Sequence, residues 1–357
     1  MKPWGPAGMD VTGPEENTNP SGVETMLRRT FVALAASSFM SVLPAFAADI
    51  ELLNVSYDPT RELWRDINEH FIPKYDKETG NTLSIKQSHG GSSTQARAVI
   101  DGLEADVVTL ASIIDTDAIR KVGLIKEGWI DRLPDRSLPY YSTVVFVVRK
   151  GNPNGIKDWP DLVKPDVAIV TPNPKTSGNG YLSFFSAWGS VTVRGGSRED
   201  AIKYVTQLYK QVPVLDSGAR GATTTFVQKN IGDVHLAWEN EAHLEVLEAK
   251  GGLEIVYPPI SIRAEPHVAV VDDNVDRKGT REAAEAYLKY LYTDEAQEII
   301  ASHFYRPTND TILKKHADSF PDIHLFPITD IAESFQDAHK KFIGEGGVFD
   351  EIYKPKG

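Results

Sequence analysis

Short apolar runs alternate with helix-length amphipathic stretches along most of the chain. In the first part, the pattern predicts strands at 50–55, 83–86 and 106–110, and helices at 60–71, 94–103 and 115–122. Further along, it predicts strands at 141–149, 167–170, 212–215 and 234–238, with helices ending near Trp188, Lys229 and Ala249. This order is typical of parallel sheets flanked by helices, so we expect an α/β fold.

The helical period is clearest at residues 281–292. Ala284, Tyr287, Leu288 and Leu291 recur at the spacing that places them on one apolar stripe of a helix. Thr293 follows, and its hydroxyl is suited to cap the start of the next helix.

The N-terminal region has the features of an export signal. Residues 1–25 have no apolar period, and we interpret them as a misassigned or non-native extension. Residues 26–47 combine paired arginines, an apolar run and the sequence Ala45-Phe46-Ala47, the pattern of a cleaved signal peptide. We therefore expect a periplasmic protein. The paired arginines leave both the Sec and the twin-arginine export routes open.

Net charge and cysteine content narrow the possible functions. The chain carries a net charge of −12 and has no cysteine. Removing residues 1–47 takes away three basic and four acidic residues, so the mature chain stays acidic, which argues against nucleic acid as a partner. The absence of cysteine excludes thiolate metal sites and cysteine nucleophiles. An anionic ligand would have to be held by local donors.

Four turns rich in Ser, Gly, Thr or Asp each join an apolar run to a helix. They lie at 56–60, 88–92, 176–180 and 216–221. Each places amides and small hydroxyls at a helix start, where the helix dipole favours negative charge. None carries the lysine of a phosphate-binding P-loop. Together they predict a pocket that holds a small, fully ionised oxyanion by dipoles.

Single residues in these turns each allow two interpretations. Ser177, Gly178 and Asn179 form either a nest of backbone amides for an anion or a flexible loop. Trp238 is either a donor to an acceptor-only ligand or a core residue. Asp58 is either a helix cap or an acceptor that orients amides or Arg220.

Enzymatic interpretations have weaker support. His89 is more typical of a solvated turn histidine than of a ligand or base. His235, Glu239, Glu241 and His243 cluster in sequence but lack metalloprotease spacing, and no nucleophile-elbow motif is present. We therefore expect no catalytic residue, no metal and no cofactor.

Several long segments resemble the periplasmic sulfate-binding proteins of ABC-type sulfate/thiosulfate importers. The segments are 52–63, 87–92, 171–178, 215–221, 237–242, 264–266, 287–292 and 304–307. The resemblance spans essentially the whole mature chain. It implies a two-lobed periplasmic binding protein fold of type II, each lobe a mixed, mostly parallel sheet flanked by helices, with a hinge of two crossover strands.

The resemblance also implies roles for individual residues. It implies a hydroxyl donor at Ser92, amide donors at Ser177, Gly178, Asn179 and Ala219, an indole donor at Trp238, and supporting roles for Asp58 and Arg220. One departure stands out. The family often continues Ser-Gly with Gly-Ala-Arg-Trp, whereas this chain continues with Asn179-Gly180-Tyr181-Leu182. The missing Arg and Trp put the rim of the pocket, and any preference between sulfate and thiosulfate, in doubt.

The expected organisation follows from these features. The Pro-flanked segments 139–148 and 258–271 are candidate crossovers, which gives a first lobe at 48–140, a second lobe at 141–260, and a return to the first lobe with a C-terminal tail at 261–357. The predicted function is sulfate capture, as a monomer, and delivery to an inner-membrane ABC permease. The alternatives are a thiosulfate- or molybdate-binding protein of the same fold, or a secreted ester hydrolase.

Overall fold

The computed structural model describes residues 48–353. The predicted signal peptide 26–47 and the extension 1–25 lie outside these residues. Within the described range, no helix is both long enough and apolar enough to cross a membrane.

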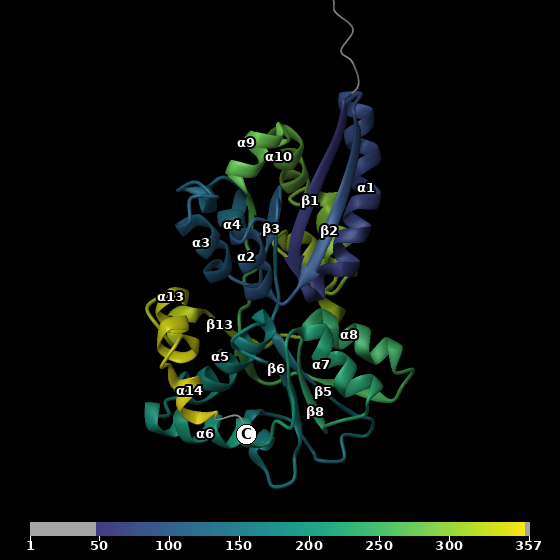
Figure 1. Ribbon diagram of the computed structural model, residues 1–357. Coiled ribbons are helices and arrows are strands. Elements are labelled where there is room, and N and C mark those ends of the chain that lie inside the picture. Colours follow the sequence, from purple (N-terminus) through teal and green to yellow (C-terminus); the bar gives the residue numbers. More distant parts are fainter. Residues whose placement is uncertain (1–47, 354–357) are drawn as a thin grey trace, which may run out of the picture. The chain divides into compact units, whose positions relative to one another are not determined.

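The first sheet has the strand order β11-β3-β1-β2. Strand β1 (Asp49–Tyr57) pairs in parallel with β2 (Thr82–Gly90) and β3 (Val107–Thr109), and β11 (Val268–Val270) pairs antiparallel with β3. The helices beside it are α1 (Arg61–Thr79), α2 (Ser92–Ile100), α3 (Ile113–Lys121), α9 (Asp272–Lys278) and α10 (Arg281–Tyr290) (Figure 1). The first three predicted strands and helices are confirmed.

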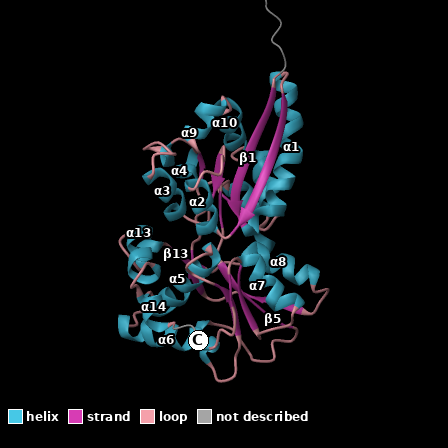
Figure 2. Cartoon of the chain, in the orientation of Figure 1, coloured by secondary structure: helices cyan, strands magenta, loops and turns pink. Residues whose placement is uncertain are grey.

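The second sheet has the order β7-β6-β8-β5-β9. Its strands are β5 (Val144–Arg149), β6 (Ile169–Pro172), β7 (Leu215–Asp216), β8 (Val234–Trp238) and β9 (Leu253–Val256). Strand β8 pairs in parallel with β6 and antiparallel with β5. Its helices are α5 (Gly178–Thr192), α6 (Arg198–Lys210), α7 (Ala219–Thr223), which continues as a π-helix (Thr224–Gln228), and α8 (Glu239–Glu248) (Figure 2). The sheet is mixed, as predicted.

Two adjacent segments carry the chain from the first sheet to the second and back, and a third pass follows between Pro307 and His324. The chain leaves the first sheet through β4 (Tyr140–Tyr141) and returns from β10 (Ile260–Ile262) to β11. Ser142 and Ala264 form an antiparallel bridge, so these first two passes lie side by side. Both fall within the predicted crossover segments. The lobe boundaries at 48–140, 141–260 and 261–357 stay predictions.

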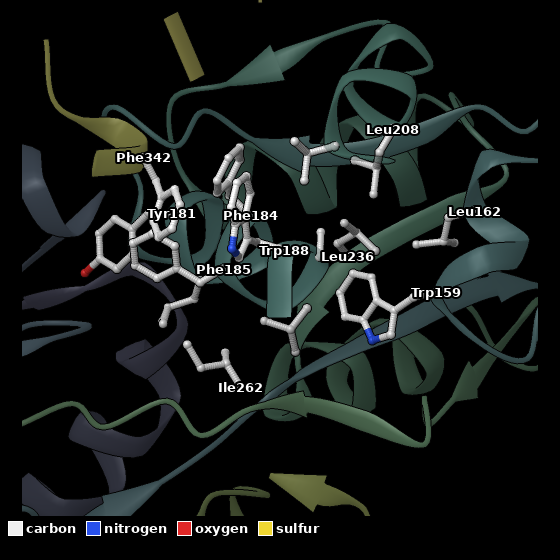
Figure 3. Packing of buried hydrophobic residues seen from close by; sticks show 14 of the residues in the cluster. Trp159, Leu162, Tyr181, Phe184, Phe185, Trp188, Leu208, Leu236, Ile262 and Phe342 are labelled. Carbon is white, nitrogen blue, oxygen red and sulfur yellow. The ribbon is translucent and has the colours of Figure 1, made fainter. Parts of the chain in front are cut away.

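The C-terminal elements divide between the two halves. The remaining elements are α4 (Pro134–Ser137), α11 (Asp294–Ser302), β12 (Arg306–Pro307), α12 (Asp310–Lys315), β13 (His324–Phe326), α13 (Phe335–Ala338) and α14 (Val348–Ile352). Strand β12 pairs with β4, whereas β13 pairs with β10. Phe342 and Phe349 belong to the same buried cluster as Phe184 and Trp188 of α5 (Figure 3). The end of the chain therefore packs with the second sheet.

The predicted stripe at 281–292 is confirmed in α10. Ala284, Tyr287, Leu288 and Leu291 are all 0% exposed, which explains why this helix presents one apolar face. The amide of Ala296 donates to Thr293 Oγ1 at 3.3 Å. Thr293 is therefore the N-cap of α11, as predicted.

Candidate functional site

Helix starts from both sheets meet around one small space. The residues that line it are Tyr57, Asp58, Pro59, Gly90, Gly91, Ser92, Ser177, Gly178, Asn179 and Ala219. The first six follow strands of the first sheet, and the other four follow strands of the second. All four turns singled out in the sequence therefore contribute to one place. This position, beyond the carboxyl ends of parallel strands, is where open α/β sheets bind ligands.

Glycines allow the two halves to approach closely here. A Cβ atom on Gly178 would lie 2.1 Å from the Cβ atom of Ala111, which follows the first sheet. A Cβ atom on Gly218 would lie 2.3 Å from Asp58 Oδ2. A side chain at either position would push the two halves apart.

The backbone donors come from helix first turns, whose amides have no partner within the helix. Ser92 begins α2, Gly178 and Asn179 begin α5, and Ala219 begins α7. Outside their helices, none of these four amides donates to another backbone group of the described residues. The helix dipoles add a positive potential at the same ends. The wall of the space therefore favours an acceptor-only anion.

The hydrogen bonds of the two serines bear on which of their groups is free to bind a ligand. The Ser92 hydroxyl donates to Asp115 Oδ2 at 2.6 Å and accepts the Ala111 amide at 2.9 Å. This hydroxyl is engaged, whereas the Ser92 amide is free of backbone partners among the described residues; the role of Ser92 as the hydroxyl donor stays a prediction.

The amide of Ser177, by contrast, donates to the carbonyl of Asn173 at 3.0 Å. Its role as an amide donor to the ligand stays a prediction. The Ser177 hydroxyl accepts a long bond from the Gly180 amide (3.4 Å), and its own proton has no acceptor among the described residues. Ser177 thus has a free hydroxyl at the place where Ser92 was expected to supply one.

Trp238 lies behind the lining residues. It ends β8, is 0% exposed, and its ring centroid lies 5.1 Å from that of Tyr57, which lines the space. Its indole Nε1 is buried and has no hydrogen-bond partner among residues 48–353. Trp64, a core residue of the first half, also has an unpartnered indole Nε1, so this feature is compatible with both predicted roles of Trp238.

The two predicted supporting residues do not pair with each other. Asp58 accepts from Arg61 at 2.7 Å, so it does not hold Arg220 as one interpretation suggested. Arg220 instead contacts Glu62 of α1 at 3.1 Å and Glu241 of α8 at 3.2 Å. Because Glu62 follows the first sheet and Arg220 the second, this ion pair links the two halves. Burial raises the pKa of Glu241 to about 7, against the opposing effect of Arg220.

His89 does not line the space. Its Nδ1 lies 2.7 Å from Ser56 Oγ and its Nε2 lies 2.6 Å from Gln87 Oε1. Burial, and then the charge of Arg61, lower its pKa to about 4, so it is a neutral, half-buried structural residue.

The acidic and histidine cluster considered for a metal is dispersed. His235 pairs with Glu245 at 2.8 Å, and Glu239 pairs with Arg306 at 2.8 Å. Among the residues that the structure describes, no three carboxylate or imidazole groups gather in a way that could hold a metal ion.

The sequence analysis did not single out Asp115 and Tyr181, which lie next to the space. Asp115 is in the first turn of α3 and Tyr181 is in α5, and the Tyr181 hydroxyl donates to Asp115 Oδ2 at 2.8 Å. The available signal was the departure at Asn179–Leu182, which marked Tyr181 as unusual. Asp115 resembled any acidic residue at a helix start.

Two α/β halves that are joined by paired crossing segments, with helix starts closing on one small space, define a periplasmic binding protein. The model of the family described as "Bacterial extracellular solute-binding protein" matches residues 64–306. The chain is 52% identical over 323 residues to a sulfate-binding protein of Escherichia coli, covering 90% of this chain and 96% of that one. It is 48% identical over 331 residues to a thiosulfate-binding protein of Pseudomonas aeruginosa, covering 92% and 100%.

A solved structure agrees with these relatives. The sulfate-binding protein SubI from Mycobacterium tuberculosis superposes with a TM-score of 0.74 at 29% identity, covering 82% of this chain and 99% of that one. The chain therefore belongs to the sulfate-binding protein family of bacterial extracellular solute-binding proteins. Members of this class are transport components and not enzymes, which removes the ester hydrolase alternative.

Proposed function

We propose that this protein captures sulfate in the space between the two halves and delivers it to an ABC permease. The donors would be the amides of Ser92, Gly178, Asn179 and Ala219, the hydroxyl of Ser177 and the indole of Trp238. Asp58 lines the same space, and its amide, at the start of a short 3-10 helix (Asp58–Thr60), is a further candidate. The observation that carries the proposal is the meeting, around one space, of helix first-turn amides from both halves that have no backbone acceptor outside their helices among the described residues.

The donor set accounts for discrimination against phosphate. Sulfate carries no proton at neutral pH and only accepts hydrogen bonds. Hydrogen phosphate would bring an O–H group into the space, and the proposal requires that Asp58, the one carboxylate among the lining residues, whose Oδ1 accepts from Arg61, does not accept that proton. An unpaired buried O–H costs roughly 1–3 kcal/mol. Sulfate is therefore the favoured ligand.

Thiosulfate is the second candidate. The 48% identity to the Pseudomonas aeruginosa thiosulfate-binding protein over that protein's whole length supports it. Thiosulfate is also a fully ionised acceptor, so the same donors would serve it, and discrimination would rest on the size of the space. The two ligands can be separated by direct titration.

Delivery would couple ligand capture to closure of the two halves. Sulfate selects the closed arrangement, and the closed form is what a permease in the inner membrane would recognise. The periplasmic location, export through residues 26–47, and a monomeric state belong to this proposal. The predicted twin-arginine or Sec route stays open.

Calorimetry on residues 48–357 tests the ligand. We expect one sulfate per chain, with tight binding that phosphate does not compete for. Thiosulfate is titrated in parallel. Tight thiosulfate binding with weak sulfate binding would replace the ligand and keep the site, whereas no binding of either ion would refute the proposal.

A further inference from the structure

Asp115 sits at the centre of a buried network of hydroxyl groups. Its Oδ2 accepts from Ser92 (2.6 Å) and Tyr181 (2.8 Å), and its Oδ1 accepts from Ser93 Oγ (2.9 Å). The residue is 5% exposed. No Lys, Arg or His of the described chain lies within ion-pair distance of it. Burial raises the pKa of Asp115, and the three hydroxyl donors, with a smaller effect of His339, act against that rise.

Tyr181 supplies the one donor that comes from the other half of the molecule. Ser92, Ser93 and Asp115 belong to α2 and α3 beside the first sheet, whereas Tyr181 belongs to α5 beside the second. Its ring packs near Phe185, with centroids 5.8 Å apart, and its hydroxyl points out of the aromatic cluster (Figure 3).

The direction of this hydrogen bond is fixed by chemistry. Burial, and then the neighbouring Asp115, raise the pKa of Tyr181 well above its usual value, so the phenol keeps its proton. It has one proton and lies 2.8 Å from the carboxylate and 2.9 Å from Ser112 Oγ. The carboxylate takes that proton, because it only accepts, and the Ser112 hydroxyl donates to the phenol oxygen.

We propose that Tyr181 and Asp115 form a latch that holds the two halves closed over the ligand. Asp115 is at the same time a positioning residue. By binding Ser92 and Ser93 it fixes the first turn of α2, whose amide faces the space. Tyr181 reaches this carboxylate only when the two halves are in contact. The Tyr181–Asp115 bond joins α5 to α3, whereas the Arg220–Glu62 ion pair joins α7 to α1. The two contacts therefore connect the halves through different helices.

The proposal for the ligand-bound state rests on the proposed function. A hydrogen bond made only in the closed form stabilises that form. Losing a donor to a charged group lowers the affinity of a ligand that requires closure by about tenfold to a hundredfold. We expect most of this loss of affinity to come from a faster dissociation rate, because the ligand first binds the open form, which does not contain the bond.

The Tyr181→Phe variant tests the latch, with Tyr209→Phe as the matched control. Tyr209 is also a buried tyrosine, 2% exposed, on α6, and its hydroxyl has no hydrogen-bond partner within residues 48–353. We expect Tyr181→Phe to raise the sulfate dissociation rate about tenfold or more, with an association rate that does not fall, because more of the ligand-free protein is then open. Tyr209→Phe is expected to match the parent.

A ligand-independent readout separates the latch from the proposed function. The chain has no cysteine, so Lys86→Cys and Lys203→Cys, at side chains 68% and 80% exposed in the two halves, give one unique pair for spin labels. We expect Tyr181→Phe to shift the distance distribution toward open forms. If the parent binds no sulfate and this shift is still seen, the latch stands and the proposed function fails.

Two results would overturn the latch. One is a Tyr181→Phe variant with the dissociation rate and distance distribution of the parent. The other is an equal loss of affinity and of melting temperature in Tyr181→Phe and Tyr209→Phe, since that would assign the effect to core packing.

Discussion

At the scale of single residues, the two pocket serines have separate tasks. Ser177 has a hydroxyl proton without an acceptor, whereas the Ser92 hydroxyl binds Asp115 and the Ala111 amide. We expect Ser177→Ala to weaken sulfate binding about tenfold to a hundredfold without lowering the melting temperature. We expect Ser92→Ala to lower the unfolding free energy by about 1–3 kcal/mol, because it leaves a buried amide unpaired.

Calorimetry and urea unfolding of both variants check this assignment. Each variant is the control for the other, since both remove one oxygen atom from the same pocket wall. A Ser177→Ala variant with parental affinity, beside a Ser92→Ala variant that loses affinity at parental stability, would restore the original assignment of the hydroxyl donor.

Gly178 supports a second prediction at this scale. An added Cβ would lie 2.1 Å from that of Ala111, so Gly178→Ala is expected to prevent closure and to abolish tight sulfate binding. The ligand-free protein relieves the clash by opening, so its melting temperature changes little. Gly344→Ala is the control, because Gly344 does not line the space and its Cβ would meet its neighbours at an ordinary 3.4 Å. Equal affinity in the two variants would contradict the prediction.

The sequence located the donor-bearing turns but not the atom that each residue uses. Turn composition and helix starts are local properties, and they predicted Ser92, Ser177, Gly178, Asn179 and Ala219 around one space. Whether a serine offers its amide or its hydroxyl depends on partners elsewhere. Asp115 takes the Ser92 hydroxyl from another helix, and no local pattern contains that fact.

At the scale of elements, periodicity predicted where strands and helices occur along the chain better than which other elements they pair or pack with. The strand at 212–215 is an exception, because only Leu215–Asp216 pairs. The end of the chain is another. The sequence does not indicate which sheet Phe326 and Phe342 pack against. In the structure both lie in the core of the second half.

The packing of the C-terminal segment gives a prediction at this scale. Phe342 is 4% exposed, and its ring centroid lies 4.5 Å from that of Trp188 in α5. We expect Phe342→Ala to lower the unfolding free energy by about 3–5 kcal/mol, because it opens a cavity in the core. Urea unfolding measures the loss, and Leu247→Ala, at a residue 65% exposed, is the control. A loss no larger than that of the control would show that the segment is not part of this core.

At the scale of the whole molecule, the alternation of strands and helices predicted an α/β chain, and the Pro-flanked segments indicated where it crosses between halves. The sequence did not predict which residues make the contact between the two halves. This contact depends on glycines such as Gly178 and Gly218 meeting residues of the other half, and on pairs such as Arg220 with Glu62. The two residues of the ion pair, for example, are 158 positions apart along the chain.

Stability of the whole molecule is expected to fall in acid partly because of buried histidines. Burial lowers the pKa of His267 to about 4, from an ordinary value of 6.5. The unfolded chain therefore binds a proton more readily than the folded one between these values. The stabilising contribution is complete above pH 6.5 and is lost as the pH falls through that range toward 4. For one such group the full effect is about 3 kcal/mol.

The His267→Asn variant tests this linkage through the slope of stability against pH. His267 is 6% exposed and lies edge-on to Trp129, with ring centroids 6.3 Å apart, so the substitution also lowers stability at every pH through lost packing. That loss shifts the curve without changing its slope. Unfolding free energies from urea titrations between pH 7 and pH 4 should therefore decline less steeply in the variant than in the parent. His70→Asn, at an exposed position on α1, controls for the substitution itself. A His267→Asn curve parallel to that of the parent would mean that the acid sensitivity comes from other groups, of which His89 and His243, whose pKa values burial also lowers to about 4, are the next to test.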